Sequence, residues 1–214
     1  MLKMAIGLML TCATAALGQV GPMTIDFDGP LPEGWAADGA EVVAGRAGQG
    51  LLVTGDAAPR LPMPGFVTEG FDITLQVRHE AALADLHFEE LVYLNHDTED
   101  LKNRIVLRKR IGTDRILFAI TNGAGNTKGE IFAGNWYAMQ SPELDWAAGS
   151  WHELRITASR ARGKAALYVD GKLVAQAEGT LLPDAAGTLC IGNWSGRSQA
   201  LATFDDITIA PAGE

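Results

Sequence analysis

The fold is decided by residues 149–174, which read GSWHELRITASRARGKAALYVDGKLV. Two sets of side chains alternate over residues 151–158, and this period of two indicates a half-buried β-strand. A polar segment around Gly163 predicts a turn, and a second alternation after it predicts a second strand. Asp170-Gly171 is the preferred pair for a two-residue type I′ hairpin turn, because both positions need positive φ. The stretch therefore predicts two strands, a tight turn and the start of a return strand.

The rest of the chain shows the same pattern of short strands. Predicted strands cover residues 23–27, 41–44, 50–54, 71–80, 91–94, 104–110, 115–121 and 130–139. Residues 57–65 hold three prolines and are expected to be extended and unpaired, and residues 81–90 are the one segment expected to form a helical turn. Many short strands separated by Gly, Asn and Asp turns predict an all-β, two-sheet antiparallel β-sandwich.

Several of these segments resemble the concanavalin A-like, laminin-G-like jelly-roll domains of secreted bacterial proteins. The similarity spans about residues 23–210 and rests on the following motifs: GSWH at 149–152, YVDGKL at 168–173, IGN at 191–193, FDDI at 204–207, FDG at 27–29 and GRAGQGL at 45–51. The resemblance implies one jelly-roll domain over residues 19–214. It implies little about function, because the superfamily includes lectins, glycosidases, lyases and interaction modules.

The first 18 residues have the features of an export signal. Lys3 provides the positive start, residues 4–10 form a short apolar region, and residues 16–18 form a small-residue cleavage site. The apolar run is too short to span a bilayer, and no other segment approaches the ~20 apolar residues that a transmembrane helix needs. We therefore expect a periplasmic or secreted protein. Acylation of Cys12, as in a lipoprotein, is the less favoured alternative.

Charge and cysteine content narrow the classes of partner. The formal net charge is −9, from 17 basic and 26 acidic residues, and so acidic a protein is a poor candidate for binding nucleic acid or anionic lipid. After signal removal Cys190 is the one remaining cysteine, and we expect a buried, inert thiol. A local basic stripe would favour carboxylated or sulfated glycans if it forms a site; it comprises Lys102, Arg104, Arg108, Lys109, Arg110 and Arg115.

Catalysis is not expected, although one motif resembles that of jelly-roll glycosidases. Those enzymes carry a Glu-x-Asp-x-x-Glu strand, and retaining hydrolysis needs two carboxyl groups about 5–5.5 Å apart. Glu143 and Asp145 match the first two positions, but Ala148 stands at the third. The segments 28–35 and 71–73 also resemble the 3-keto-glycoside hydrolases, without that family's Asn-Ser-Gly strand. A glycoside hydrolase of this kind therefore stays open as an alternative.

The preferred hypothesis is a non-catalytic, lectin-like domain that binds an oligo- or polysaccharide. Sugar sites need aromatic faces for the pyranose rings and planar polar groups for the hydroxyls. The candidate ligand-binding residues are Tyr93, Asn95, Trp136, Tyr137, Trp194 and Arg197. A laminin-G-like protein-interaction module is a second alternative, which a flat apolar patch in place of a cleft would favour.

A structural Ca²⁺ ion between Asp28 and Asp206, where the two ends of the domain meet, is one of two open interpretations. The jelly-roll resemblance implies that the first and last strands pair, so that Phe27 and Phe204 point into the core and Asp28 and Asp206 approach each other. Carboxylate oxygens gathered in this way are the ligands that calcium requires. The alternative is a solvated acidic edge that prevents pairing between sheet edges.

Overall fold

A computed structural model describes residues 22–31, 33–36, 39–55, 57, 59–81, 90–95, 104–109, 114–121, 136–178, 187–192 and 200–213. The predicted signal segment, most of the predicted helical turn over 81–90, and the candidate residues Trp194 and Arg197 lie outside these ranges. Among the described residues, no helix has the length and apolar character that crossing a membrane requires.

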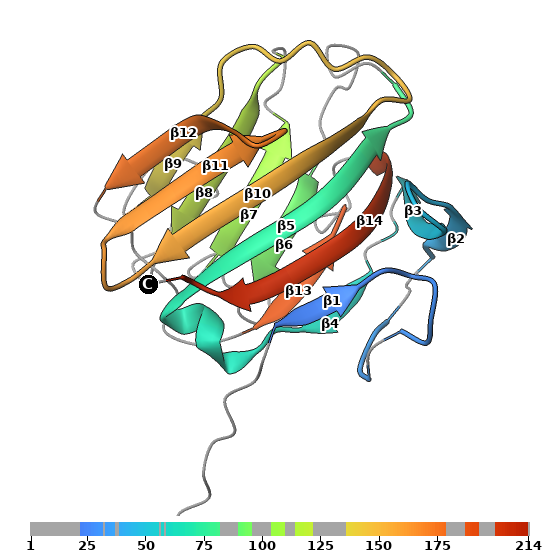
Figure 1. The fold of residues 1–214 in the computed structure, drawn as a ribbon, viewed down its shortest axis with the longest axis horizontal. Helices are drawn as coiled ribbons and strands as arrows, with labels where there is room; N and C mark the ends of the chain where they lie inside the picture. The colour runs from blue at the N-terminus through green and yellow to red at the C-terminus, as the bar shows by residue number, and fades with distance from the viewer. Residues whose placement is uncertain are drawn as a thin grey trace, which may run out of the picture.

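The chain forms two antiparallel sheets, one in front of the other in Figure 1. The eight-stranded sheet has the order β12-β11-β10-β5-β14-β3-β2, with β1 also paired to β14. Its strands are β1 (Met23–Ile25), β2 (Glu41–Ala44), β3 (Gln49–Gly55), β5 (Gly70–His79), β10 (Trp151–Ser159), β11 (Lys164–Val169), β12 (Lys172–Glu178) and β14 (Ala200–Pro211).

The six-stranded sheet has the order β4-β13-β6-β7-β8-β9. Its strands are β4 (Arg60–Pro62), β6 (Glu90–Asn95), β7 (Arg104–Lys109), β8 (Ile116–Thr121), β9 (Trp136–Gln140) and β13 (Thr188–Ile191). A short 3₁₀ helix, Gly65–Thr68, connects β4 to β5. Two antiparallel sheets packed face to face confirm the predicted β-sandwich.

Residues 149–174 fold as their sequence pattern predicts. β10 pairs with β11, and β11 pairs with β12. Leu154 and Ile156 are fully buried while Arg155 between them is exposed, because successive residues of a strand face opposite sides of the sheet. Asp170 and Gly171 have φ of 49° and 72°, the two positive values that a type I′ turn needs.

The core lies between the two sheets. Phe71, Ile73, Leu75 and Val77 on β5 are fully or almost fully buried, and Phe118 on β8 belongs to the same cluster. Burying one such side chain contributes about 1.5–3 kcal/mol to folding. The alternate positions of β5 face outward, so the outer face of the eight-stranded sheet is free to carry polar groups.

The proline-rich segment is paired, which corrects one expectation from sequence. Residues 60–62 form β4, which pairs with β13 at the edge of the six-stranded sheet. The prolines are tolerated because an edge strand has one partner and a proline keeps its carbonyl acceptor. The N–H of Ile191 donates to the Pro59 carbonyl at 3.1 Å, and Leu61 is buried in the core. Burial of Leu61 explains why the segment packs as a strand.

β14 joins most of the eight-stranded sheet together. One side of it pairs with β5 along nearly its whole length. The other side pairs first with β3, through residues 200–204, and then with β1, where Ile207 lies opposite Ile25. The expected pairing of the first and last strands is therefore confirmed, and Phe27 and Phe204 are both buried.

A β-bulge lies where β14 changes partner. Asp205 pairs with Gln76 and Thr208 pairs with Thr74, so two residues of β14 lie opposite the single residue between Gln76 and Thr74, as in a bulge. Asp206 has a φ of 47°. The bulge shifts the phase of the strand, and residues three apart, Phe204 and Ile207, both reach the core. Without it they would lie on opposite faces.

The carboxylate of Asp205 is completely buried and fully used by backbone donors. The N–H groups of Arg46 and Ala47 donate to Oδ2 at 2.7 and 3.2 Å, and the N–H of Asp206 donates to Oδ1 at 2.8 Å. A Cβ at Gly45 would collide with the same carboxylate. The loop of residues 45–50, between β2 and β3, is therefore tied onto the bulge.

We predict that Asp205→Asn lowers the free energy of unfolding by about 1.5–3 kcal/mol, the value of a hydrogen bond to a charged group. An amide turns one acceptor oxygen into a donor that faces backbone N–H groups. Urea denaturation at neutral pH, followed by tryptophan fluorescence, measures the change. Asp145→Asn, at an exposed position, serves as the control and should stay within about 0.5 kcal/mol of the wild type. Equal stability of all three proteins would contradict the role given to Asp205.

Candidate functional site

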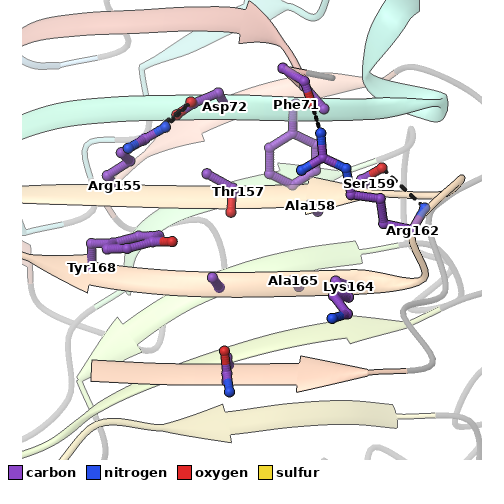
Figure 2. Close-up of a pocket in the computed structure, with 14 residues that line it drawn as sticks. Phe71, Asp72, Arg155, Thr157, Ala158, Ser159, Arg162, Lys164, Ala165 and Tyr168 are labelled. Carbon is purple, nitrogen blue, oxygen red and sulfur yellow. Dashed lines mark hydrogen bonds and ion pairs between the residues drawn. The ribbon is translucent and has the colours of Figure 1, made fainter. Parts of the chain in front are cut away.

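A groove lies on the outer face of the eight-stranded sheet, over strands β5, β10, β11 and β12 (Figure 2). Its volume is about 380 Å³. We call it the outer-face groove, and the lining residues used below are Asp72, Arg155, Thr157, Arg162, Lys164 and Tyr168. They come from the outward-facing positions of the adjacent strands β5, β10 and β11 and from the turn between β10 and β11.

An ion pair and an aromatic ring form one end of the groove. Nε of Arg155 donates to Oδ1 of Asp72 at 2.9 Å, and Nη2 donates to Oδ2 at 2.5 Å. These hydrogen bonds raise the pKa of Arg155. The guanidinium also lies 5.4 Å from the ring centre of Tyr168, in a cation–π contact. Because Asp72 holds the guanidinium, Arg155 holds the ring of Tyr168 in a defined place.

The other end of the groove is formed by the turn between β10 and β11. Arg162 belongs to this turn, where its N–H donates to Oγ of Ser159 at 3.3 Å and its Nη2 donates to the carbonyl of Gly213. Figure 2 shows Arg162 and Lys164 at this end and Thr157 between the two ends. The cationic groups outnumber the carboxylates on this lining, although the protein as a whole is acidic.

None of the groove residues belongs to the set predicted from sequence. That set was chosen by aromatic content, whereas the groove is lined by two rings, the half-buried Tyr168 and the fully buried Phe71. One sequence signal was available, because alternation over 151–158 already assigns Arg155 and Thr157 to the polar face. The contribution of Asp72 could not be predicted from the sequence, because it depends on β5 lying beside β10.

The described members of the predicted aromatic set lie on the six-stranded sheet. Tyr93 and Asn95 are on β6, and Trp136 and Tyr137 are on β9, two strands separated by β7 and β8. The register places Asn95 and Trp136 in one row, about 14 Å apart at 4.8 Å per strand. A shared binding surface for these residues stays a prediction.

The two carboxylates of the glycosidase-like motif are solvent exposed. Glu143 forms an ion pair with Arg115 at 3.3 Å, and its side chain is 74% exposed. Asp145 is exposed as well. The catalytic acid of a glycosidase needs a sheltered setting, and these two exposed positions do not provide one.

A histidine–aspartate pair joins the turn between β11 and β12 to the start of β10. Nδ1 of His152 lies 2.8 Å from Oδ2 of Asp170, and the N–H of Glu153 donates to Oδ1 of the same carboxylate at 2.9 Å. The imidazole stacks on Trp146 at 4.3 Å between ring centres, and Trp146 is buried. We interpret this cluster as structural, because both oxygens of Asp170 and one face of the imidazole are used in packing.

Four aspartates gather around the 45–50 loop and the bulge. Burial raises the pKa of Asp206, and the neighbouring Asp205 carboxylate raises it further, with smaller effects from Asp26 and Asp28. Oδ1 of Asp28 accepts a hydrogen bond from the N–H of Gln49 at 2.7 Å. Asp28 and Asp206 therefore belong to one electrostatic cluster, as the strand pairing implied.

The calcium ion expected at Asp28 and Asp206 finds no ready set of ligands. Among the residues that the structure describes, no group of three or more Asp, Glu, His or Cys side chains could hold a metal ion. Three of the carboxylate oxygens of Asp28 and Asp205 already accept backbone N–H groups. These backbone N–H donors reduce the repulsion between the carboxylates, which is the effect that a bound cation would also have. Calcium binding stays a prediction.

Comparisons with known proteins identify the family and the fold. The model of a family described as the concanavalin A-like lectin/glucanases superfamily matches residues 91–211. Comparison of the sequence with curated proteins finds no match.

Solved structures with a similar fold include three proteins with bound saccharides or analogues. Domain 4 of AbnA, an extracellular GH43 arabinanase from Geobacillus stearothermophilus in complex with arabinotriose, has a TM-score of 0.60 and 14% identity, over 89% of this chain and 82% of that one. The binding domain of botulinum neurotoxin DC in complex with SialylT has a TM-score of 0.60 and 9% identity, over 84% and 43%. Trypanosoma rangeli sialidase with 2,3-difluorosialic acid has a TM-score of 0.58 and 15% identity, over 84% and 28%. The chain thus spans less than half of the neurotoxin domain and of the sialidase.

We predict that Asp206→Asn stabilises the protein at neutral pH in EDTA. The pKa of Asp206 is raised in the folded state. The charged carboxylate present at neutral pH therefore lowers the free energy of unfolding, and an uncharged amide removes this loss. The gain should disappear as pH falls below the ordinary pKa of an aspartate, where the wild-type side chain is protonated in both states. Asparagine tolerates the positive φ of this position. Thermal melting from pH 3 to pH 8 tests this, and parallel curves for both proteins would contradict it.

A calcium ion at this cluster would raise the melting temperature of the wild type above its value in EDTA. Calcium at 100 times its Kd adds about 2.7 kcal/mol, which corresponds to several degrees for a domain of this size. Asp206→Asn should lose this increment, and magnesium at equal concentration serves as the ion control. A wild-type melting temperature that is the same in EDTA and in millimolar calcium would rule the site out.

Proposed function

The chain belongs to the concanavalin A-like lectin/glucanase superfamily, and from this premise we propose that it is a non-catalytic domain that binds an oligo- or polysaccharide in the outer-face groove. The observation that carries the proposal is the ring of Tyr168, held by Arg155, which is held in turn by Asp72. An aromatic surface that is already in place costs little conformational entropy when a ligand stacks on it.

Polar groups for sugar hydroxyls lie within reach of that ring. Thr157 lines the groove between its two ends, and Gln176 of β12 lines it as well. A saccharide needs an aromatic face for its C–H groups and fixed donors and acceptors for its hydroxyls. The groove offers both on β-strands, which position side chains more firmly than loops do.

Two neighbours of the same fold support a saccharide as the class of ligand. Domain 4 of the arabinanase was solved with arabinotriose and the neurotoxin domain with SialylT. The hydrolase alternative lacks a favourable observation, since the exposed Glu143 and Asp145 do not form a sheltered pair.

We also propose that the protein is exported to the periplasm or the cell exterior. The support comes from residues 1–18, with their basic start, short apolar run and small-residue cleavage site. A polysaccharide ligand fits such a location. Acylation at Cys12 remains the alternative route to the same side of the membrane.

The test is a glycan array probed with the wild type, Tyr168→Ala and Tyr168→Phe. We expect the wild type to bind a saccharide, Tyr168→Ala to lose about tenfold or more in affinity, which corresponds to ~1.4 kcal/mol, and Tyr168→Phe to keep most of it because the ring remains. Isothermal titration calorimetry with the array hit gives the affinities.

A third variant, Trp136→Ala, distinguishes binding in the outer-face groove from binding on the six-stranded sheet. Loss of binding in Trp136→Ala with full binding in Tyr168→Ala would place the saccharide on the six-stranded sheet and overturn the proposed groove. No binding of the wild type to any neutral or acidic glycan would overturn the carbohydrate-binding function itself.

A further inference from the structure

The two ends of the outer-face groove differ in how their positive charge is balanced. Arg155 is neutralised by three hydrogen bonds to the carboxylate of Asp72. The guanidinium of Arg162 donates to the carbonyl of Gly213, which is neutral. In the part of the chain that the structure describes, no carboxylate pairs with Arg162. One end of the groove is therefore close to neutral and aromatic, and the other carries a positive charge.

The guanidinium of Arg162 has donors to spare. Arginine presents five N–H donors in a planar fork that matches a carboxylate in two places, and one nitrogen, Nη2, is bonded to the Gly213 carbonyl. Figure 2 shows the side chain at the rim of the groove, on the same side as Lys164. The remaining edge of the guanidinium suits an anionic ligand that lies along the sheet.

The distance between the two ends exceeds the size of one sugar ring. Lys164 and Tyr168 are four residues apart on β11, which corresponds to about 13 Å at 3.3 Å per residue. The floor between them carries small side chains, Thr157 and Ala166. A ring stacked on Tyr168 and an acidic group at Arg162 therefore belong to different units of one chain.

We propose that the outer-face groove selects an acidic saccharide of two or more units, with one ring on Tyr168 and the anionic group of another unit on Arg162. This inference rests on the proposed carbohydrate-binding function. It adds that the saccharide is acidic and that its anionic group lies at the Arg162 end of the groove. The protein carries a net charge of −9, which repels an anion in general, so the selectivity comes from the local charge at Arg162. Carboxylate and sulfate groups share this chemistry, and the experiment separates them.

The test compares acidic oligosaccharides with neutral ones of the same backbone. The ligands are oligogalacturonate, oligomannuronate and unsulfated chondroitin oligosaccharides, each in native and carboxyl-reduced form, and carboxyl-reduced chondroitin that retains sulfate. We expect the wild type to prefer at least one acidic form over its neutral form by about 10- to 100-fold, as for one charge-assisted hydrogen bond. The preference should shrink as salt is raised, because exposed charges are screened.

Arg162→Gln should lose this preference while it keeps the affinity for the neutral form. Lys172→Gln is the matched control, since it removes the same charge from an exposed position on the neighbouring hairpin and should leave the preference unchanged. Binding of the sulfated, carboxyl-reduced ligand that also depends on Arg162 would identify sulfate as the anion. Thermal melting of both variants verifies that they are folded.

The outcomes separate this inference from the proposed function. Binding of neutral saccharides that is lost in Tyr168→Ala, with no preference for acidic forms, would leave the proposed function in place and overturn the acidic ligand. A preference that survives in Arg162→Gln would overturn the role of Arg162. If no saccharide of either kind binds, the proposed function and this inference are both wrong.

Discussion

The buried carboxylate of Asp205 is the constraint on which the rest of this structure depends. A charge without solvent is very costly unless it is hydrogen-bonded, and here three backbone N–H groups satisfy it. Two of these donors belong to the 45–50 loop, so that loop has to lie over β14. The third belongs to Asp206, whose conformation forms the bulge. One side chain thereby links the loop, the bulge and the change of strand partner from β3 to β1.

The outer face of the eight-stranded sheet is polar as a consequence of how its inner face packs. Leu154 and Ile156 on β10 enter the core, which leaves Arg155 and Thr157 on the opposite side. Arg155 then reaches across to Asp72 on β5 and over Tyr168 on β11. The alternation that places apolar side chains in the core therefore also places Asp72, Arg155 and Tyr168 on the outer face of three adjacent strands. A site built on such strands is held by the packing of the whole sandwich.

Charge is distributed unevenly over this sheet. Burial, together with the neighbouring Asp205 carboxylate, raises the pKa of Asp206 near the bulge, while the groove near Arg162 carries positive charge. A cation at one end of the groove attracts anions at that place, although the protein as a whole is acidic. The family resemblance gives no such detail, because superfamily members share a scaffold and differ in their sites.

The sequence by itself determined the local features of this protein. The family resemblance carried by the motifs at Phe27 and Phe204 implied the jelly roll and the pairing of its ends. Alternation and the Asp170-Gly171 pair predicted the central hairpins. These signals are readable because side-chain period and turn conformation depend on neighbouring residues. The predicted aromatic set was a choice by composition, which carries no information about which strands lie together.

Only the tertiary structure decided which distant segments meet. The pairing of the proline-rich β4 depended on burial of Leu61 at the edge of the six-stranded sheet. The phase shift at Asp206 depended on a loop more than 150 residues earlier in the chain. The groove depended on Asp72 lying beside β10, 83 residues away from its partner Arg155. The physical reason is that sheet order and register are set by packing between segments far apart in sequence, which no local pattern of residues encodes.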